Sequence, residues 1–329
     1  MKTLQVGLGD RSYEIQVASG NIEKLSAFGE NTVVVTDDNV WRLYGNRFPH
    51  VKPITLRHGE ASKSLETLGF LYSEFASRGL SRNGTVVAFG GGVVGDVTGF
   101  AAATYMRGVK FIQIPTTLLA QVDSSVGGKT AINIPQGKNL AGAFYQPSLV
   151  LIDPDTLNTL DVREIRSGMA EVIKYAAIRS PKLFDMDDYA DIITECCRIK
   201  AEIVAQDEQD FGERMILNFG HTFGHAVEAA GNFERYNHGE AVAIGMVIAA
   251  EIGEKLGFTQ HGCAEKLRNV CNAKGLDTHC PYSPEELIPY CKLDKKSSIK
   301  DVKFVFLRSF GEVFVAIIPF ETLEEAAKW

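Results

Sequence analysis

Apolar residues in the first half of the chain fall into short β-branched runs separated by stretches of helical periodicity. These runs predict strands at residues 33–36, 54–56, 85–89, 111–114 and 149–152. Between residues 63 and 78 the apolar side chains recur at helical spacing, and Gly79 follows as a stop signal. Strands that alternate with helices favour a parallel sheet with crossover connections. Residues 3–17 alternate around Gly9-Asp10, which predicts a β-hairpin at the edge of that sheet.

The second half of the chain has a different pattern, which begins after Asp153. Long helical periodicity predicts helices at residues 163–178, 190–205, 215–230, 240–256 and 264–274. The exception is residues 302–318, where two alternating segments flank a turn at 309–311 and predict a small hairpin. We therefore predict an α/β N-terminal nucleotide-binding domain at residues 1–153 and a mainly α-helical C-terminal domain at residues 154–329. The cleft between two such halves is the usual position of a ligand site.

Composition and charge then exclude several classes of protein. The chain has 329 residues, of which 45% are hydrophobic and 23% charged, as in typical globular domains. A formal charge of -7 gives no electrostatic footprint for duplex nucleic acid or for an anionic membrane, and it still allows a local cationic pocket. The longest apolar stretch, residues 241–250, is shorter than the ~18 to 20 residues that cross a bilayer. Residues 1–20 have no signal-peptide pattern and no cysteines are spaced C-x-x-C, so we expect reduced thiols and a cytoplasmic protein.

A glycine-rich turn follows the strand predicted at residues 85–89. The segment from Gly90 to Asp96 fits G-x-G-x-x-G between a strand and a helix, where backbone N–H groups can bind a pyrophosphate. A tight turn that uses glycine only for packing explains the same residues equally well. Asp37, at the end of an earlier strand, can accept hydrogen bonds from ribose hydroxyls or cap the next helix.

Two lysines, Lys129 and Lys138, each follow glycine in predicted turns. Ammonium groups in such turns can reach a phosphate, and Thr116 and Thr117 add hydroxyl donors after a strand. Taken singly, each lysine is better explained as an exposed loop residue. Their concentration in one short stretch that also contains Asp123 favours a phosphate site.

The strongest local pattern is a histidine cluster in the second half. His221 and His225 are four residues apart, so on a helix both face the same side, and His238 follows soon after. Imidazoles together with a carboxylate such as Glu171 can hold a divalent cation and leave a position open for water or substrate. The spacing is not that of H-E-x-x-H proteases, and paired histidines on a helix face are more often structural. Lys174 lies three residues after Glu171, where a simple i,i+3 ion pair is the plainest explanation.

Taken in this order, the motifs resemble the 3-dehydroquinate synthase family from about residue 37 to residue 296. The matches are nearly continuous at residues 90–100, 115–139, 168–175 and 218–226, with His238-Gly239-Glu240. The resemblance implies a dehydroquinate synthase-like fold, with an NAD-binding α/β domain, a helical domain and the active site between them. It also implies a homodimer that uses NAD as a catalytic cofactor and Zn2+ or Co2+ as the metal.

The resemblance assigns the metal and substrate residues position by position. The implied metal ligands are Glu171, His221 and His238. The implied catalytic residues are Asp123, Lys129, Lys174, Asn218 and His225. The implied substrate-binding residues are Asn139, Lys200, Arg214, Lys296 or its neighbour Lys295, and Arg107 of the partner subunit. His225 therefore moves from the metal to the substrate phosphate, and Lys200 and Arg214 meet the substrate carboxylate.

The same resemblance implies an NAD site in the first half. The adenosine end would be held by Asp37, Asn39, Glu60 and Lys63. The pyrophosphate would lie against Gly92, Val93, Val94, Gly95 and Asp96. The other implied cofactor contacts are Thr116, Thr117, Lys129, Lys138, Thr156 and Thr159. His58 stands where the family often has aspartate and is expected to alter cofactor affinity, and Asp210 stands where a longer acid is frequent.

The resemblance also implies a reaction, the second step of the shikimate pathway toward chorismate and the aromatic amino acids. In it 3-deoxy-D-arabino-heptulosonate 7-phosphate becomes 3-dehydroquinate and phosphate. Transient oxidation at C5 acidifies the C6 proton, phosphate leaves, C5 is reduced again, and an intramolecular aldol reaction closes the ring.

Three other functions compete with this one. Another sugar-phosphate cyclase, making 2-epi-5-epi-valiolone or 2-deoxy-scyllo-inosose, would have no use for Lys200 and Arg214 because its substrate lacks a carboxylate. A metal-dependent alcohol or glycerol dehydrogenase would need no phosphate pocket, and Lys129, Lys138 and Lys174 argue against it. A non-catalytic NAD-binding module would be expected to have lost catalytic residues, and no loss is evident.

Overall fold

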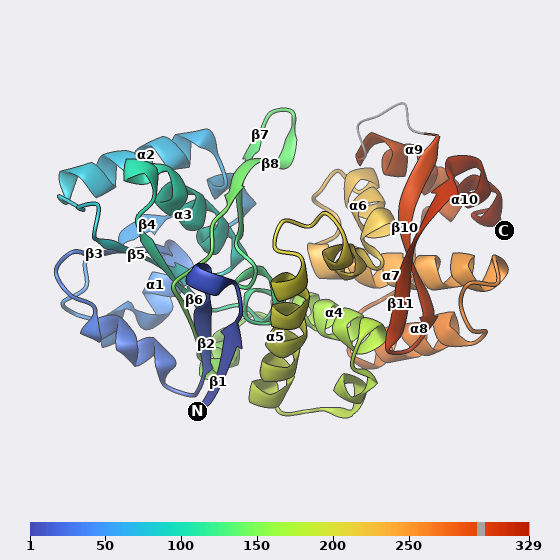
Figure 1. Ribbon diagram of the computed structural model, residues 1–329, viewed down its shortest axis with the longest axis horizontal. Helices are drawn as coiled ribbons and strands as arrows, with labels where there is room; N and C mark the ends of the chain where they lie inside the picture. Colours follow the sequence, from blue (N-terminus) through green and yellow to red (C-terminus); the bar gives the residue numbers. More distant parts are fainter. Residues whose placement is uncertain (295–299, 329) are drawn as a thin grey trace. The chain divides into compact units, whose positions relative to one another are not determined.

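The computed structural model describes residues 1–294 and 300–328 (Figure 1). Lys295 and Lys296, which the sequence assigns to the substrate, lie outside the described residues. The chain divides into two compact units. Unit 1 comprises Met1–Asp161 and Asp188–Gln209, and unit 2 comprises Val162–Asp187 and Asp210–Trp329.

Unit 1 is built on a seven-stranded sheet with the order β1-β2-β9-β6-β5-β3-β4. The strands are β1 (Lys2–Val6), β2 (Tyr13–Val17), β3 (Thr32–Asp37), β4 (Ile54–Leu56), β5 (Thr85–Gly90), β6 (Lys110–Pro115) and β9 (Leu149–Ile152). β1 and β2 form an antiparallel hairpin, and the other neighbouring strands are parallel. The predicted parallel strands and the predicted edge hairpin are therefore present.

Both faces of this sheet are buried by helices. Val86 and Ala88 of β5 belong to a core shared with α2 (Leu65–Ser77) and α3 (Gly92–Thr104). Val87 and Phe89 of the same strand belong to a second core, shared with α1 (Asp38–Tyr44). Successive side chains of a strand point to opposite faces, so a strand buried on both sides has no polar positions. This explains why the inner strands β5 and β9 are nearly continuous apolar runs.

A second, two-stranded sheet in unit 1 was not predicted. β7 (Lys129–Ile134) and β8 (Gly137–Phe144) pair as an antiparallel hairpin in the stretch where the sequence indicated lysine-bearing turns. Close approach of the two strands requires glycine at position 142, because a Cβ there would lie 2.2 Å from the Thr130 carbonyl oxygen. Lys129 therefore begins a strand, and Lys138 lies near the start of its partner.

Unit 2 is mainly helical, as predicted, with one hairpin. Its longer helices are α4 (Val162–Ile178), α6 (His221–Ala230), α7 (His238–Lys255), α8 (Cys263–Ala273), α9 (Pro284–Asp294) and α10 (Phe320–Ala326). The hairpin is β10 (Asp301–Ser309) and β11 (Glu312–Pro319), at the predicted place. Helices α9 and α10 were not predicted. Among the described residues no helix has the length and apolarity needed to span a membrane.

The helix predicted at residues 215–230 is interrupted. A 3-10 segment, η9 (Glu213–Asn218), precedes α6, and Gly220 between them has a left-handed φ of 79°. A Cβ on Gly220 would lie 2.5 Å from Met246 Cγ, and one on Gly245 would lie 2.1 Å from the Gly220 carbonyl oxygen. Contact with α7 therefore decides the break, and it places His221 at the start of α6.

Helix α5 (Tyr189–Gln206), which was predicted to belong to the C-terminal domain, is part of unit 1. It packs against β1, β2 and the short π-helical segment η6 (Ala120–Ser124). Cys197 of α5 contacts the Gln121 carbonyl oxygen at 3.2 Å. The first segment of unit 1 also continues to Asp161, beyond the predicted boundary at residue 153. One change of sequence pattern predicts one domain boundary, whereas the chain leaves unit 1 after residue 161 and returns to it after residue 187.

Candidate active site

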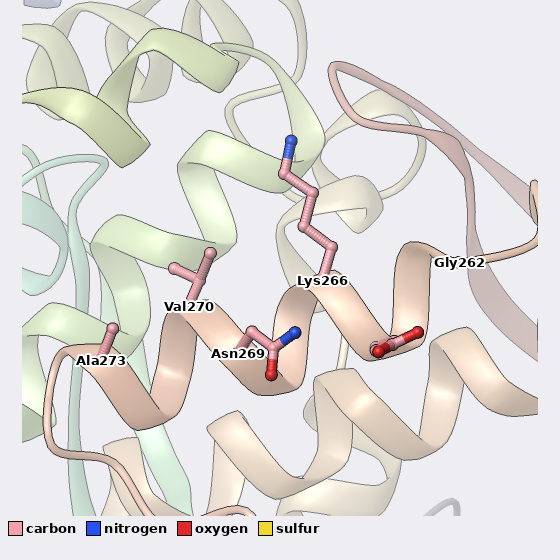
Figure 2. Close-up of a pocket in the computed structure, with 6 residues that line it drawn as sticks. Gly262, Lys266, Asn269, Val270 and Ala273 are labelled. Carbon is pink, nitrogen blue, oxygen red and sulfur yellow. The ribbon is translucent and has the colours of Figure 1, made fainter.

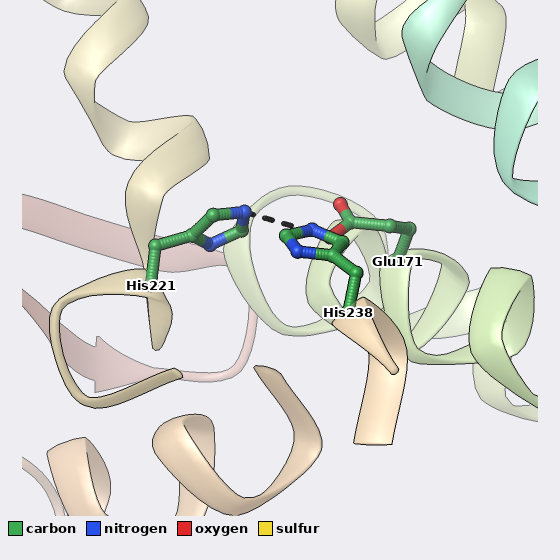
Figure 3. Close-up of side chains that lie close together, drawn as sticks. All are labelled: Glu171, His221 and His238. Atoms are coloured by element: carbon green, nitrogen blue, oxygen red, sulfur yellow. Dashed lines mark ion pairs between the residues drawn. The ribbon is translucent and has the colours of Figure 1, made fainter. Parts of the chain in front are cut away.

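Three side chains from three helices of unit 2 converge (Figure 3). Glu171 comes from α4, while His221 and His238 are the first residues of α6 and α7. Glu171 Oε1 lies 3.6 Å from His221 Nε2 and 3.4 Å from His238 Nε2. One donor atom from each side chain lies within 4.8 Å of the other two. One carboxylate and two imidazoles form a donor set suited to a divalent transition metal with open positions.

Close packing of α4 against α7 positions the carboxylate relative to the second imidazole. The Gly239 N–H donates to Ser167 Oγ at 3.1 Å, and a Cβ on Gly239 would lie 2.1 Å from the Ser167 carbonyl oxygen. A capping box of Asn237 and Glu240 begins α7, and Arg163 of α4 donates to Glu240 at 2.8 Å. The segment around His238 therefore begins α7 and provides Gly239, whose small size allows α7 to contact α4.

The two histidines differ in their protonation. Burial lowers the pKa of His221 to about 3, against the opposing effect of Glu171. Burial also acts to lower the pKa of His238, but the carboxylates of Glu171 and Glu228 outweigh it and raise the pKa to about 10. Without a metal the cluster therefore combines a neutral imidazole with an imidazolium. A divalent cation would take the place of that proton.

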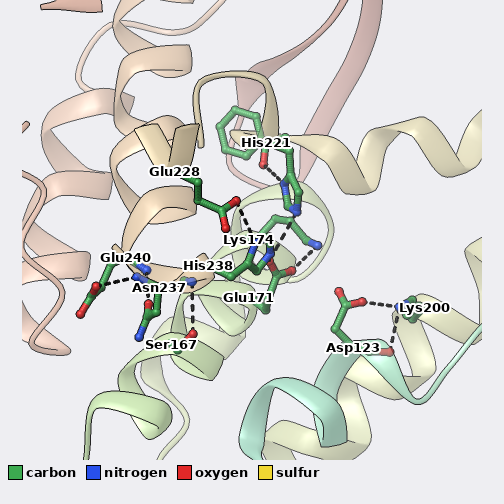
Figure 4. A network of polar contacts seen from close by, with 12 residues as sticks. Asp123, Ser167, Glu171, Lys174, Lys200, His221, Glu228, Asn237, His238 and Glu240 are labelled. Carbon is green, nitrogen blue, oxygen red and sulfur yellow. Dashed lines mark hydrogen bonds and ion pairs between the residues drawn. The ribbon is translucent and has the colours of Figure 1, made fainter. Parts of the chain in front are cut away.

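Two other predicted residues of unit 2, Lys174 and His225, lie beside this cluster, and Figure 4 shows the first of them. Lys174 is 2% exposed and pairs with Glu171, which is the i,i+3 ion pair that the sequence suggested. The ring of His225 is 5.6 Å from that of His221 and 6.4 Å from that of His238. Arg214 is buried and Asn218 half-buried, both in η9.

In unit 1 the carboxyl ends of β3, β5 and β6 meet at one edge of the sheet, beside the glycine turn. Gly91 is the N-cap of α3, and no side chain among the described residues caps that helix. A Cβ on Gly91 would lie 2.9 Å from Thr117 Cγ2, and one on Gly92 would lie 3.2 Å from Ser124 Oγ. The packing explanation therefore holds, and the first N–H groups of α3 remain suited to an anion. Val93, Val94, Gly95 and Asp96 complete the first turns of this helix.

A buried lysine connects several predicted residues of unit 1. Lys63, with 5% of its side chain exposed, donates to Asp96 Oδ2 at 2.7 Å and to Asn139 Oδ1, and lies 3.9 Å from Glu60. Burial raises the pKa of Asp96, and Lys63 opposes that shift. Asn133 donates to Glu60 at 2.7 Å and accepts from the Asn139 N–H at 2.9 Å. Four predicted residues thus lie in one network, together with an asparagine that the sequence analysis missed.

Asp37 is the N-cap of α1, since its Oδ1 accepts from the Val40 N–H at 2.8 Å. Burial raises the pKa of this carboxyl. The capping role is therefore present, and the second carboxylate oxygen has capacity to accept a further hydrogen bond. Asn39 accepts from Arg42 at 2.8 Å in the first turn of the same helix.

The position that departs from the family, His58, has a partner at this edge of the sheet. Its Nδ1 lies 2.7 Å from Asp38 Oδ1, and this hydrogen bond lowers the pKa of Asp38. The second departure, Asp210, has a left-handed φ of 62°.

Asp123 and Lys200, from η6 and α5, form a pair in unit 1 (Figure 4). Lys200 Nζ donates to the Asp123 carbonyl oxygen at 2.8 Å and also to its carboxylate. Three other predicted cations, Arg107, Lys129 and Lys138, are exposed. Arg107 has a left-handed φ of 66°, which is uncommon outside glycine.

The predicted threonines differ in their accessibility to a ligand. The Thr156 hydroxyl is in the interior, where it donates to the Asp153 carbonyl oxygen at 2.8 Å and accepts from Gln121 at 2.9 Å. Thr159 Oγ1 donates to the Thr156 carbonyl oxygen at 3.1 Å. The Thr116 N–H, next to the glycine turn, donates to the Gly90 carbonyl oxygen at 3.0 Å.

Comparison with known proteins decides the family. The family model for the 3-dehydroquinate synthase N-terminal part matches residues 53–167, and the model for its C-terminal part matches residues 168–297. The chain belongs to the 3-dehydroquinate synthase family. Both the family and the enzyme class predicted from the sequence, a cyclase and lyase, are confirmed.

Relatives within the 3-dehydroquinate synthase family match nearly the whole chain. The 3-dehydroquinate synthase of Clostridium acetobutylicum is 46% identical, over 96% of this chain and 96% of its own. That of Dictyoglomus thermophilum is 43% identical, over 99% and 96%. These relatives confirm the predicted function, 3-dehydroquinate synthase.

Solved structures confirm the dehydroquinate synthase-like fold. A 2-deoxy-scyllo-inosose synthase complexed with carbaglucose-6-phosphate, NAD+ and Co2+ has a TM-score of 0.88 at 24% identity, covering 99% of both chains. A 2-epi-5-epi-valiolone synthase from Streptomyces hygroscopicus subsp. jinggangensis, with NAD+ and Zn2+ bound, has a TM-score of 0.87 at 26% identity, covering 97% of both chains. The two competing cyclases that the sequence analysis named therefore share this architecture.

Glu228, which was not predicted from the sequence, also belongs to this cluster. It lies seven residues after His221 and three after His225, so the three side chains share one face of α6. The i, i+4, i+7 spacing is visible in the sequence and could have indicated it. The pairing of Asn133 with Glu60 gave no such signal, because it joins segments far apart in the chain.

A separate hollow of about 380 Å³ lies along α8 (Figure 2). It is lined by Gly262, Glu265, Lys266, Asn269, Val270 and Ala273. None of these residues was predicted to bind a ligand, and the lining comes from one helix and the residue before it.

Proposed function

We propose that this chain performs the 3-dehydroquinate synthase reaction with NAD as a catalytic cofactor and one divalent metal ion. The observation that carries the proposal is the convergence of Glu171, His221 and His238 in unit 2. A carboxylate and two imidazole Nε2 atoms at mutual distances suited to one ion fit a catalytic metal site, which keeps positions open for substrate. The ion is proposed to be Zn2+ or Co2+.

The NAD site is proposed to lie at the carboxyl edge of the unit 1 sheet. The uncapped start of α3, from Gly92 to Asp96, can receive the pyrophosphate. Asp37, Asn39 and Glu60 are proposed to hold the adenosine end, with Lys63 bridging Glu60 and Asp96. The remaining proposed contacts with the cofactor are Thr116, Thr117, Lys129, Lys138, Thr156 and Thr159.

The substrate anions are proposed to be recognised by cations and amides. In unit 2, Lys174, Asn218 and His225 would stabilise charge on the phosphate that leaves. Arg214 is suited to the carboxylate, because a guanidinium can donate two parallel hydrogen bonds to it. The proposed contributors from the rest of the chain are Lys129, Asn139, Lys200, Lys296 and Arg107 of the partner subunit. This last assignment makes the homodimer part of the proposal.

When bound, NAD supplies temporary oxidation at C5, and the metal supplies Lewis-acid polarisation of the C4 and C5 hydroxyls. The chain supplies binding, orientation and proton control. Lys200 donates to both the backbone carbonyl oxygen and the carboxylate of Asp123, and so fixes the orientation of a carboxylate near which a sugar hydroxyl can be placed. The six free thiols and the formal charge of -7 agree with a cytoplasmic enzyme acting on a small molecule.

The test is a reaction of the purified protein with 3-deoxy-D-arabino-heptulosonate 7-phosphate deuterated at C5, NAD and Zn2+. We expect one phosphate per 3-dehydroquinate, no stoichiometric NADH, and retention of deuterium at C5, because hydride leaves and returns to the same carbon. Omission of NAD or chelation of the metal should stop phosphate release. NADH that accumulates in step with product, or loss of the label, would contradict the mechanism and favour a dehydrogenase. Comparable turnover of glucose 6-phosphate would favour another cyclase.

A further inference from the structure

Glu228 lies on the far side of the His238 ring from Glu171. The ring of His238 has its Nε2 3.4 Å from Glu171 and its Nδ1 3.6 Å from Glu228 Oε2 (Figure 4). Glu228 is held on α6, the helix that also supplies His221, and 12% of its side chain is exposed. A nearly buried carboxylate beside the second nitrogen of a metal-binding imidazole is a recurrent arrangement in metalloproteins.

We propose that Glu228 is a positioning residue for His238. Its carboxylate favours the tautomer with the proton on Nδ1, and it thereby presents the lone pair of Nε2 to the metal. The negative charge also makes the imidazole a stronger donor. The proposal rests on the metal site of Glu171, His221 and His238 proposed above.

The other histidine has an equivalent arrangement built from backbone. His221 Nδ1 lies 3.2 Å from the Phe219 carbonyl oxygen, and its Nε2 faces Glu171. In both rings the Nδ1 atom therefore faces an acceptor of the protein, and the Nε2 atom faces the shared carboxylate. The acceptor for His221 cannot be removed by substitution, whereas the acceptor for His238 can.

Geometry also favours Glu228 as a residue that supports His238 over Glu228 as a direct ligand of the metal. His225, Glu228 and His238 form a second group whose donor atoms lie within 4.8 Å of one another. This group would use His238 Nδ1, while the first group uses Nε2, and the two groups share that one ring. The first group includes Glu171, which is 1% exposed, so it provides the more desolvated anionic donor.

The test compares Glu228→Gln and Glu228→Ala with the wild type and with a control, Glu254→Gln. Glu254 lies on α7 and forms a similar pair, 3.3 Å from His261 Nδ1, but His261 is fully exposed and belongs to neither donor group. Co2+ affinity is measured by competition with a chelator. We expect Glu228→Ala to bind Co2+ about 10 to 100 times more weakly, Glu228→Gln to be intermediate, and the control to be unchanged.

A spectroscopic measurement separates positioning from general loss of structure. In the Co2+-loaded protein, the Nδ1 proton of His238 should give a paramagnetically shifted NMR signal that exchanges slowly with water. In Glu228→Ala this signal should broaden or disappear, while the corresponding signal of His221 persists. Equal thermal stability of the metal-free variants excludes misfolding as the cause.

The reference variant Glu171→Ala distinguishes failure of this inference from failure of the metal site. If Glu171→Ala loses Co2+ and Glu228→Ala binds as tightly as the wild type, the positioning role is wrong and the metal site stands. If Glu171→Ala retains Co2+, the metal site itself is wrong. A wild-type stoichiometry of two ions that falls to one in Glu228→Ala would make Glu228 a ligand and overturn the proposal.

Discussion

Glu171 and Lys174 are buried partners, with 1% and 2% of their side chains exposed. A buried ion pair adds little net stability when intact, because both charges lose their hydration. Loss of one partner is costly, since the other charge is then left uncompensated in the interior. The cluster therefore combines a proposed metal-binding function with a structural requirement that can be measured separately.

We predict that Glu171→Gln, in the metal-free protein, lowers the free energy of unfolding by ~3 to 5 kcal/mol. Adding Lys174→Met should recover most of that loss, because it removes the lysine charge that the first substitution leaves without its buried partner. Neither variant should bind metal. Urea unfolding and elemental analysis measure the two effects, and an unchanged unfolding midpoint for Glu171→Gln would contradict the first.

Cys197 is a buried thiol whose pKa burial raises to about 12. The unfolded chain, with a thiol pKa of ~8.5, releases this proton at lower pH than the folded protein does. Stability from this group is therefore complete below about pH 8.5 and falls as the pH rises toward the folded pKa. Cys280, the partly exposed cysteine, is the thiol expected to react first in the folded protein.

Between about pH 8 and about pH 9.5 the free energy of unfolding of the wild type should fall. We predict that this fall is ~1 kcal/mol smaller in Cys197→Ala. Urea titrations at each pH measure it. Burial also raises the pKa of Cys280, though by less, so Cys280→Ala should reduce the loss by a smaller amount. Thiol labelling of the folded protein at about pH 8 should be lost in Cys280→Ala and kept in Cys197→Ala. The opposite labelling pattern would show that Cys197 is accessible.

At the scale of elements, the contact of α4 with α7 carries the largest consequence. It depends on Gly239, where any Cβ would overlap the backbone of Ser167. The strain falls on backbone atoms, so rotation of a side chain cannot relieve it, and the two helices must separate. Separation would move His238, the first residue of α7, away from Glu171, which lies within α4.

We predict that Gly239→Ala lowers the free energy of unfolding by ~1 to 3 kcal/mol and weakens Co2+ binding at least ~10-fold. The matched control is Gly69→Ala in α2, where the structure describes nothing within 4 Å of the added Cβ. That control should gain up to ~1 kcal/mol through its helix propensity and should leave metal affinity unchanged. Wild-type Co2+ affinity in Gly239→Ala would show that the helix spacing is not critical.

At the scale of the whole molecule, the metal and NAD are proposed to bind to different units. Donors for the metal lie in unit 2, and the glycine turn and its neighbours lie in unit 1. A ligand slows hydrogen exchange where it stabilises local structure. The two binding events can therefore be mapped separately, before any reaction takes place.

We predict that Zn2+ alone protects peptides containing Glu171, His221 and His238, and that NAD alone protects the peptide from Gly90 to Asp96. With each ligand at about 100 times its Kd, protection of its own unit should reach ~100-fold for amides that exchange through unfolding. Hydrogen-exchange mass spectrometry measures this. Protection of the glycine turn by Zn2+ without NAD would contradict the assignment of the two sites.

Features that depend on neighbouring residues were evident from the sequence. The strands of the seven-stranded sheet and the hairpins β1–β2 and β10–β11 follow from apolar periodicity, since a residue's face is set by its position in the repeat. Helices α4, α7 and α8 were predicted within a few residues for the same reason. The shared face of His221 and His225 was also evident, but the spacing alone suggested that both bind metal.

Features that depend on residues far apart in the chain required the tertiary structure. Contact with Met246 breaks the helix at Gly220, and packing on η6 assigns α5 to unit 1. Residue periodicity does not encode either contact. Likewise, the resemblance to the family supplied the set Glu171, His221 and His238, whereas the packing of three helices brings these side chains together and adds Glu228. Local sequence specifies which face a side chain occupies, and only the assembled core determines what that face meets.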